Sequence, residues 1–370
     1  MASSELAKKK VLVVDDSTLV RQMICDALNE APDMEVVGQA RSGQQAIELL
    51  NSVQPDVITL DVQMPQMNGM VALEGILALR PVPVVMVSSL TQQGAATTFE
   101  ALERGAIDYV PKPESGNLTQ AAFREDLLRK VRMAAGTDVE RILKIRQQRK
   151  LRRQQRPAAS TPKSVPTLTR DSLADQCLAI GISTGGPPAL RGLFEALQPP
   201  MPPIVVVQHM PPNFTGPLAW RLDSISALSV KEAETGDVLR PNLVLVAPGG
   251  RHLRLVKVRD EVQVKIFDAP PVSSHRPSVD VMMTSAAEIY GSRCLGVIMT
   301  GMGRDGVDGC RAIREAGGFV LGQDEATSDV YGMNKAAFVE GHVDAQFALQ
   351  DAPTLIVRQV RRQGRRVAVH

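Results

Sequence analysis

Short apolar runs alternate with amphipathic stretches along the first third of the chain. The runs lie at residues 11–14, 56–60, 82–87 and 107–110, and polar residues follow each of them. Between them, apolar residues recur at helical spacing, as at Val20, Ile24, Ala27 and Leu28. Short strands that alternate with helices predict βαβ units and a parallel sheet.

A second series of the same kind begins at Cys177. Its apolar runs lie at residues 177–182, 204–207, 243–246, 294–299 and 319–321. Residues 251–267 alternate in polarity, which predicts an antiparallel hairpin on this second sheet. The pattern therefore predicts an α/β protein with two doubly wound parallel-sheet domains.

The composition changes between the two series. Residues 141–156 carry eight basic residues and no acidic one, and residues 157–166 consist of Pro, Ser, Thr, Ala, Lys and Val. This predicts a helical tail that continues into a flexible, basic, Pro/Ser-rich linker. Binding of the basic run to an acidic surface stays open. A nucleic-acid-binding module is a further alternative, but no helix-turn-helix pattern supports it, so we expect no nucleic-acid partner.

The overall composition excludes several classes of protein. With 370 residues and 44% hydrophobic content, the chain can bury a core, unlike a disordered protein. Its net charge of +2 does not suit a basic nucleic-acid coat. The four cysteines are scattered, which argues against a zinc finger or disulfide framework. Without an apolar signal core or a membrane-length run, we expect a cytoplasmic protein without membrane insertion.

Five polar residues end successive strands of the first predicted sheet: Asp15, Asp16, Asp61, Ser88 and Lys112. The carboxyl ends of parallel strands meet at one crevice, so these side chains are expected to form one site. Clustered carboxylates favour Mg²⁺, and an aspartate can accept a phosphoryl group covalently. A lysine and a serine can then bind the phosphoryl oxygens. The pattern predicts phosphoryl transfer to Asp61.

The second series predicts a serine hydrolase. Ser183 lies in a G-x-S-x-G motif that ends a strand, and a helix should open near Pro187. His209 ends the next strand, and Asp305 follows a later one. These three residues would supply the nucleophile, base and orienting acid that such a site requires.

Two alternatives remain open on the residues alone. An α/β-hydrolase order would place the acid before the histidine, as with Asp237 and either His252 or His275. Residues 301–306 also match G-x-G-x-x-G after a strand, and Asp324 ends the next strand, which is the pattern of a dinucleotide site.

Residues 9–130 resemble a two-component response-regulator receiver domain, a flavodoxin-like fold. The motifs that carry the resemblance are, in order, residues 14–17 (VDDS), 60–65 (LDVQMP), 87–89 (VSS) and 112–113 (KP). The resemblance implies that a chemotaxis histidine kinase phosphorylates Asp61. It also implies that Asp15, Asp16 and Asp61 hold Mg²⁺, and that Ser88, Lys112 and Tyr109 respond to the phosphoryl group.

Residues 173–362 resemble the catalytic domain of the chemotaxis protein-glutamate methylesterases, a Rossmann-like three-layer domain. The matching segments are residues 181–187 (GISTGGP), 208–212 (QHMPP), 247–250 (APGG), 275–280 (HRPSVD), 300–306 (TGMGRDG) and 323–325 (QDE). By this resemblance Ser183, His209 and Asp305 form the triad. Thr184, Met302 and His275 would support the oxyanion and the substrate.

The two resemblances imply a phosphorylation-activated enzyme. It would demethylate glutamate methyl esters on chemoreceptors, release methanol and deamidate receptor glutamines, with no cofactor in the hydrolase domain. The receiver would inhibit the hydrolase until Asp61 is phosphorylated, and residues 131–172 would connect the two. We expect recruitment to receptor arrays.

Overall fold

The computed structural model describes most of the chain, namely residues 7–65, 67–89, 91–113, 120–154 and 173–367. The chain divides into two compact units between Gln147 and Gln148. The Pro/Ser-rich part of the expected linker lies outside the described residues. Among the residues described, no helix combines the length and the apolar character needed to cross a membrane.

The first unit is a five-stranded parallel sheet with helices. Its strands are β1 (Lys9–Val14), β2 (Met34–Ala40), β3 (Val57–Asp61), β4 (Val84–Ser88) and β5 (Asp108–Pro111). Its helices are α1 (Thr18–Asn29), α2 (Gly43–Val53), α3 (Gly69–Leu79), α4 (Gln92–Arg104) and α5 (Gln120–Ala135). Helix α6 (Val139–Gln154) begins in this unit and contains the boundary between the two units. The strand order β2-β1-β3-β4-β5 is the flavodoxin-like one, which confirms the expected fold.

Burial explains which strands of this unit the sequence predicts. Every residue of β3 and β4 is buried, so both strands read as continuous apolar runs. Strand β2 was not predicted, because only Met34 and Ala40 at its two ends are fully buried. It lies at the edge of the sheet and pairs with β1 alone.

The second unit contains a seven-stranded sheet. Its strands are β6 (Cys177–Ile182), β7 (Ile204–Gln208), β8 (Ser229–Glu232), β9 (Leu243–Val246), β12 (Cys294–Ile298), β13 (Phe319–Gln323) and β14 (Ala345–Phe347). The order is β14-β13-β12-β6-β7-β9-β8, and all neighbouring pairs are parallel. The helices are α8 (Gly186–Ala196), α9 (Thr215–Asp223), α10 (Val279–Tyr290), α11 (Val307–Glu315), α12 (Met333–Val339) and α13 (Ala352–Val367).

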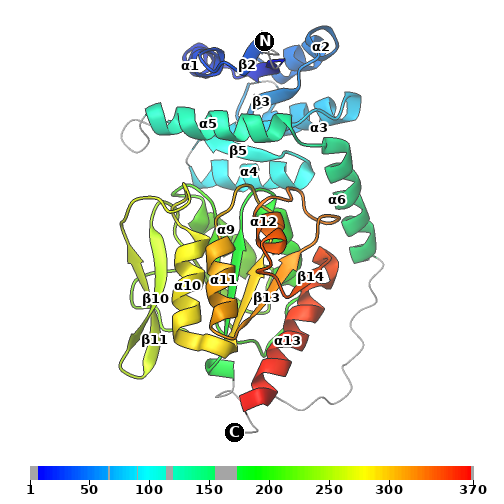
Figure 1. Ribbon diagram of the computed structural model, residues 1–370. Helices are drawn as coiled ribbons and strands as arrows, with labels where there is room; N and C mark the ends of the chain where they lie inside the picture. Colours follow the sequence, from blue (N-terminus) through cyan, green and yellow to red (C-terminus); the bar gives the residue numbers. More distant parts are fainter. Residues whose placement is uncertain (1–6, 66, 90, 114–119, 155–172, 368–370) are drawn as a thin grey trace, which may run out of the picture. The chain divides into compact units, whose positions relative to one another are not determined.

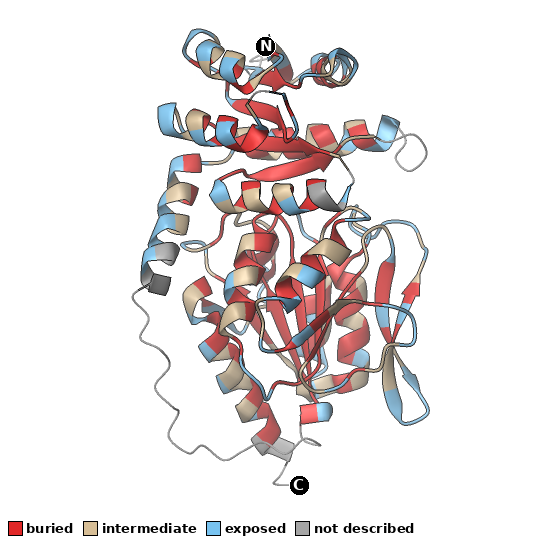
Figure 2. Ribbon diagram, turned by 180° about the vertical axis from the view of Figure 1, so that it is seen from behind, coloured by how far each residue is buried: buried red, intermediate tan, exposed pale blue. Residues whose placement is uncertain are grey.

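Helices cover both faces of this second sheet, as expected for a three-layer domain. Figure 1 shows α10, α11 and α12 in front of the strands, and these helices contact β12 or β13. Helices α8 and α9 contact each other on the opposite face. The inner strands β6, β7, β9, β12 and β13 are almost entirely buried (Figure 2).

The hairpin exists, but its expected place on the main sheet is wrong. Strands β10 (His252–Val258) and β11 (Glu261–Phe267) pair antiparallel and form a separate two-stranded sheet. Strand β10 packs against α10. Its apolar residues Leu253 and Leu255 are buried in the core that includes α10.

The order of strands determines where the predicted site residues lie. Strand β6 occupies the middle of the sheet, between β12 and β7. Ser183 follows β6, His209 follows β7, and Asp305 lies in the loop between β12 and α11. Because the three strands are parallel neighbours, their carboxyl ends open onto the same edge of the sheet.

Candidate functional site

A carboxylate cluster lies at the carboxyl edge of the first sheet. Asp15 and Asp61 are buried, whereas Asp16 is exposed. Carboxylate oxygens of these three residues lie within 4.8 Å of one another. The Lys112 Nζ lies 2.9 Å from Asp15 Oδ2 and 2.8 Å from Asp61 Oδ2. The structure thus brings together four of the five residues that the sequence pattern placed in one crevice.

The electrostatics of this cluster favour added positive charge. Burial, with a smaller contribution from the charge of Asp15, raises the pKa of Asp61 to about 6, although Lys112 acts in the opposite direction. Burial also raises the pKa of Asp15. One ammonium group therefore does not fully compensate the two buried carboxylates, and a divalent cation would.

Ser88 and Tyr109 lie on the two strands beside this cluster. Ser88 ends β4 and is buried, and its Oγ accepts a hydrogen bond from Thr98 Oγ1 at 2.9 Å. Tyr109 is buried in β5, and its ring lies 4.8 Å from Lys130 Nζ. Lys130 also donates to the Tyr109 carbonyl oxygen at 2.5 Å. These contacts give Tyr109 an inward, packed position.

Ser183 sits on a tight turn between β6 and α8. Its backbone N–H donates to the Thr300 carbonyl at 3.0 Å, and its carbonyl accepts from the Gly186 N–H at 2.8 Å. Gly185 has a φ of 79°, a conformation that favours glycine. The strand-to-helix turn predicted from the G-x-S-x-G motif is therefore present, and α8 opens at Gly186, one residue before Pro187.

Gln208 joins this turn to the next strand end. Its Nε2 donates to the Ser183 carbonyl at 3.0 Å and to the His209 carbonyl at 3.1 Å. It is 2% exposed. Gln208 was not among the predicted site residues, although a polar residue that ends an otherwise apolar buried strand is a recognisable signal.

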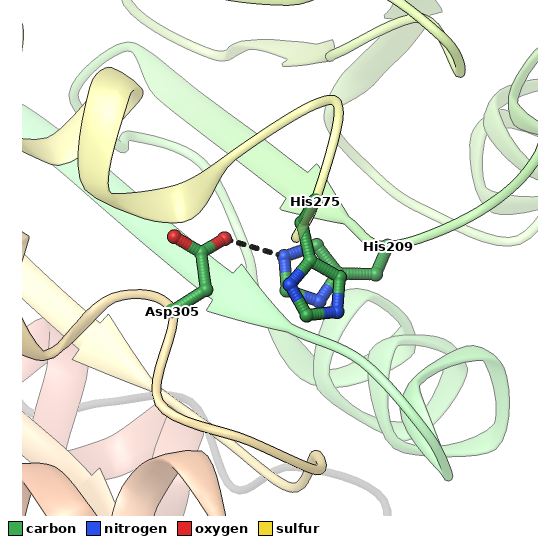
Figure 3. Close-up of side chains that lie close together, drawn as sticks. All are labelled: His209, His275 and Asp305. Carbon is green, nitrogen blue, oxygen red and sulfur yellow. Dashed lines mark hydrogen bonds and ion pairs between the residues drawn. The ribbon is translucent and has the colours of Figure 1, made fainter. Parts of the chain in front are cut away.

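His209 and Asp305 are in direct contact. The Nε2 of His209 lies 2.7 Å from Asp305 Oδ2 (Figure 3). In a chymotrypsin-type triad the aspartate accepts a hydrogen bond from Nδ1, so the two ring nitrogens of His209 have exchanged positions relative to that triad. When Nε2 donates this hydrogen bond in the neutral imidazole, Nδ1 carries the lone pair that can accept a proton.

Asp305 is held by the start of α10. Its two carboxylate oxygens accept from Ser278 Oγ at 2.7 Å, from the Val279 N–H at 2.7 Å and from the Asp280 N–H at 3.2 Å. Asp305 is fully buried. Positive partial charge at a helix N-terminus stabilises a carboxylate in this position.

Asp280 makes the reciprocal contact with the start of α11. Its Oδ1 accepts from the Gly306 and Gly309 N–H groups, both at 2.8 Å. Burial, followed by repulsion from Asp305, raises the pKa of Asp280 to about 6. Sequence reasoning missed this role of Asp280, because the contact depends on how α10 and α11 pack.

The same contact argues against the dinucleotide alternative. A pyrophosphate would need the first N–H groups of α11, but Asp280 already accepts two hydrogen bonds there. A Cβ added at Gly301 would lie 2.7 Å from Ser183 Cβ, so close packing against Ser183 explains why a glycine occupies position 301 without a bound dinucleotide. Asp324 accepts from Thr327 within its own turn.

The residues of the other hydrolase order have different partners. Asp237 accepts from Lys231 Nζ at 2.9 Å. His252 is buried in β10, and its Nε2 lies 3.0 Å from the Pro270 carbonyl oxygen. The structure therefore favours the order Ser183, His209, Asp305.

His275, Thr184 and Met302 surround the same strand ends. The His275 ring stacks on His209 with centroids 3.8 Å apart, and its Nδ1 lies 2.6 Å from the Ser273 carbonyl oxygen. The Thr184 carbonyl accepts from Thr300 Oγ1 at 3.0 Å. Met302 is half-buried in the loop that carries Asp305. The support roles of these three residues stay predictions.

Comparisons with known proteins found matches to both units of the chain. Residues 178–356 match the family model of the CheB methylesterase, and residues 11–123 match that of the response regulator receiver domain. A protein-glutamate methylesterase/protein-glutamine glutaminase from Pyrococcus horikoshii is 43% identical over 355 residues, which cover 95% of this chain and 94% of the relative.

Two further proteins are similar to this chain in sequence. A protein-glutamate methylesterase/protein-glutamine glutaminase 1 from Caulobacter vibrioides is 45% identical over 346 residues, covering 93% of this chain and 96% of the relative. The solved catalytic domain of the Thermotoga maritima CheB methylesterase is 42% identical. That match covers 50% of this chain and 97% of the domain, with a TM-score of 0.48.

Proposed function

This chain belongs to the protein-glutamate methylesterase/protein-glutamine glutaminase family, and we propose that it hydrolyses methyl esters of glutamate side chains on chemoreceptors. The observation that carries the proposal is the 2.7 Å contact between His209 and Asp305, one strand end away from Ser183. The same site would hydrolyse receptor glutamine amides, since both reactions are acyl transfers through a seryl intermediate.

The proposed chemistry follows from the hydrogen bonds. Ser183 Oγ attacks the ester carbonyl and gives its proton to His209 Nδ1, while Asp305 stabilises the imidazolium through Nε2. The imidazolium then protonates the leaving methoxide, and methanol departs. Water, activated by the same imidazole, hydrolyses the seryl ester and restores Ser183. With a glutamine substrate, ammonia leaves in place of methanol.

The developing oxyanion needs hydrogen-bond donors. We assign this role to the Met302 backbone N–H, with Thr184 and His275 supporting the substrate beside it. Typical losses on removing one such donor are about 10²–10³ in kcat, so these residues matter even though they do not react. No cofactor is required for this chemistry.

The first unit supplies the regulation in this proposal. A chemotaxis histidine kinase would donate a phosphoryl group to Asp61, and Mg²⁺ held by Asp15, Asp16 and Asp61 would neutralise charge during the transfer. The donor set fits Mg²⁺ because it consists of carboxylate oxygens within 4.8 Å of one another. An open pocket lined by Asp16, Gln63 and Thr97 gives a phosphodonor access to this edge.

Phosphorylation would relieve inhibition of the second unit. The added charge would attract Ser88 and Lys112 and change the neighbouring surface, with Tyr109 following. A tenfold activation requires only about 1.4 kcal/mol of differential stability between the inhibited and released forms.

A methanol-release assay on methylated receptor membranes tests the proposal. We expect release to rise when a small phosphodonor and Mg²⁺ are added, and a fragment from about residue 172 onward to exceed the unphosphorylated full chain. A fragment no faster than the full chain would show that the first unit does not inhibit. It would then act by docking the enzyme at receptor arrays.

A further inference from the structure

We propose that Gln208 is a positioning residue of the hydrolase, whose side-chain amide sets the separation between the nucleophile Ser183 and the base His209. This role rests on the proposed function for the reaction that it serves, whereas the hydrogen bonds that support it belong to the fold. Gln208 is 2% exposed, so it acts on turnover through the two reacting side chains and not through the substrate.

The amide of Gln208 connects the backbones of the nucleophile and the base. Its Nε2 donates to the Ser183 carbonyl oxygen at 3.0 Å and to the His209 carbonyl oxygen at 3.1 Å. Both neighbours are acceptors, so the NH2 group of the amide faces them. One planar group therefore holds two backbone carbonyls at a fixed distance from each other.

The two bonds lie just beyond the backbone pairing of β6 with β7. The His209 N–H donates to the Ile182 carbonyl at 3.0 Å, and Ile182 is the last residue of β6. Beyond this bond, Ser183 enters the turn before α8 and His209 enters the loop before α9. Gln208 thus holds the two chain segments at the point from which both catalytic side chains extend.

Gly186 makes room for this amide at the start of α8. A Cβ added to Gly186 would lie 1.9 Å from Gln208 Oε1 and 2.8 Å from Gln208 Cδ. The φ of Gly186 is not in the left-handed region, so its backbone does not require a glycine. Close packing of the Gln208 amide explains why a glycine follows the G-x-S-x-G motif.

Gln363 is a matched control, because it makes the same kind of contact away from the site. It is buried in α13, and its Nε2 donates to the Ser292 and Cys294 carbonyl oxygens at 3.3 Å and 3.1 Å. Cys294 begins β12, so these bonds lie at the edge of the sheet opposite to the site. Replacing either glutamine removes two hydrogen bonds to backbone carbonyls, but only Gln208 lies beside the triad.

Methanol release from methylated receptors by Gln208→Leu and Gln363→Leu tests the role. Gln208→Leu should lose about 10²-fold in kcat, the effect of misplacing a catalytic group by about 1 Å, and should keep the wild-type KM. Gln363→Leu should lower the Tm to a similar extent but keep the wild-type kcat. Wild-type kcat in Gln208→Leu overturns the proposal, and so does an equal loss in both variants.

Gln208→Glu adds a readout that a role in stability alone would not move, and it replaces Gln208→Leu if that variant unfolds. A carboxylate has no proton to donate to either carbonyl, whereas the protonated acid can donate to one of them. The ratio of variant kcat to wild-type kcat should therefore rise as the pH falls. In Gln363→Glu this ratio should stay near one. Equal ratios in the two variants at every pH contradict the positioning role.

Amide hydrogen exchange distinguishes failure of this proposal from failure of the proposed function. The Gly186 and His209 N–H groups donate to carbonyls of the turn and of β6. Loss of a hydrogen bond changes a local opening equilibrium by about tenfold, so both amides should exchange about tenfold faster in Gln208→Leu and at the wild-type rate in Gln363→Leu. Unchanged exchange in Gln208→Leu overturns the positioning role, whether or not the chain releases methanol. Absent methanol release by the wild type would refute the proposed function, and exchange would still decide whether Gln208 holds the two backbones.

Discussion

Replacing Gly301 by alanine probes how closely the loop before Asp305 packs against the nucleophile. A Cβ at this position would lie 2.7 Å from Ser183 Cβ and 2.5 Å from Met333 Sδ. The Met333 side chain can adjust its rotamer, whereas Ser183 Cβ is attached directly to the turn between β6 and α8. We therefore expect Gly301→Ala to displace Ser183.

The expected loss follows from that geometry. Carbon atoms in ordinary contact lie about 3.5–4.0 Å apart, so the two Cβ atoms must separate by about 1 Å. A misplacement of this size costs about 10²-fold in rate in a preorganised site. Overpacking of this kind also lowers the free energy of unfolding by about 1–3 kcal/mol.

The assay is steady-state methanol release by Gly301→Ala, with thermal unfolding to show that the protein is folded at the assay temperature. Gly192→Ala is the matched control, since nothing lies within 4 Å of a Cβ added there, in helix α8. It should raise the free energy of unfolding by about 0.5–1 kcal/mol and leave kcat unchanged. Wild-type kcat in Gly301→Ala would refute the reasoning.

Three further predictions concern single carboxylates. Asp305→Asn should lose most of kcat with little change in KM, because His209 loses its partner at Nε2; an unchanged kcat in steady-state assays would contradict this. Asp61→Asn should leave the full chain at its basal rate when phosphodonor is added, and activation of this variant would contradict the assignment. Because the pKa of Asp280 is raised to about 6, its ionised form destabilises the fold above pH 6, and this penalty disappears as the pH falls toward 4. Asp280→Asn should therefore stabilise the protein most above pH 6. Asp280→Ala should instead lower the free energy of unfolding by about 1–3 kcal/mol for each of the Gly306 and Gly309 N–H groups that loses its acceptor. Denaturant unfolding at pH 5 and pH 8 distinguishes these outcomes.

Apolar periodicity predicted the central parts of both sheets and the place of the site. Strands buried on both faces, such as β3, β6 and β12, read as continuous apolar runs, and polar residues at their ends converge in parallel sheets. The edge strands β2, β8 and β14 were not predicted, because each has few fully buried residues.

Contacts that depend on helix packing could not be predicted. Asp305 accepts hydrogen bonds from the start of α10, and Asp280 accepts hydrogen bonds from the start of α11. The spacing of 25 residues between the two aspartates does not indicate either contact. The choice of His209 Nε2 as the atom that meets Asp305 depends on the ring's rotamer. The position of the hairpin against α10 likewise depends on tertiary packing, which the alternating pattern of residues 251–267 does not specify.

In the proposed function, Ser183 is the nucleophile of a receptor methylesterase. The most direct test of this role compares methanol release from methylated receptors by wild type, Ser183→Ala and the control Ser224→Ala, an exposed serine outside the site. We predict that Ser183→Ala loses about 10⁴-fold or more in kcat while Ser224→Ala matches wild type. Turnover by Ser183→Ala within tenfold of the wild-type rate would contradict the account.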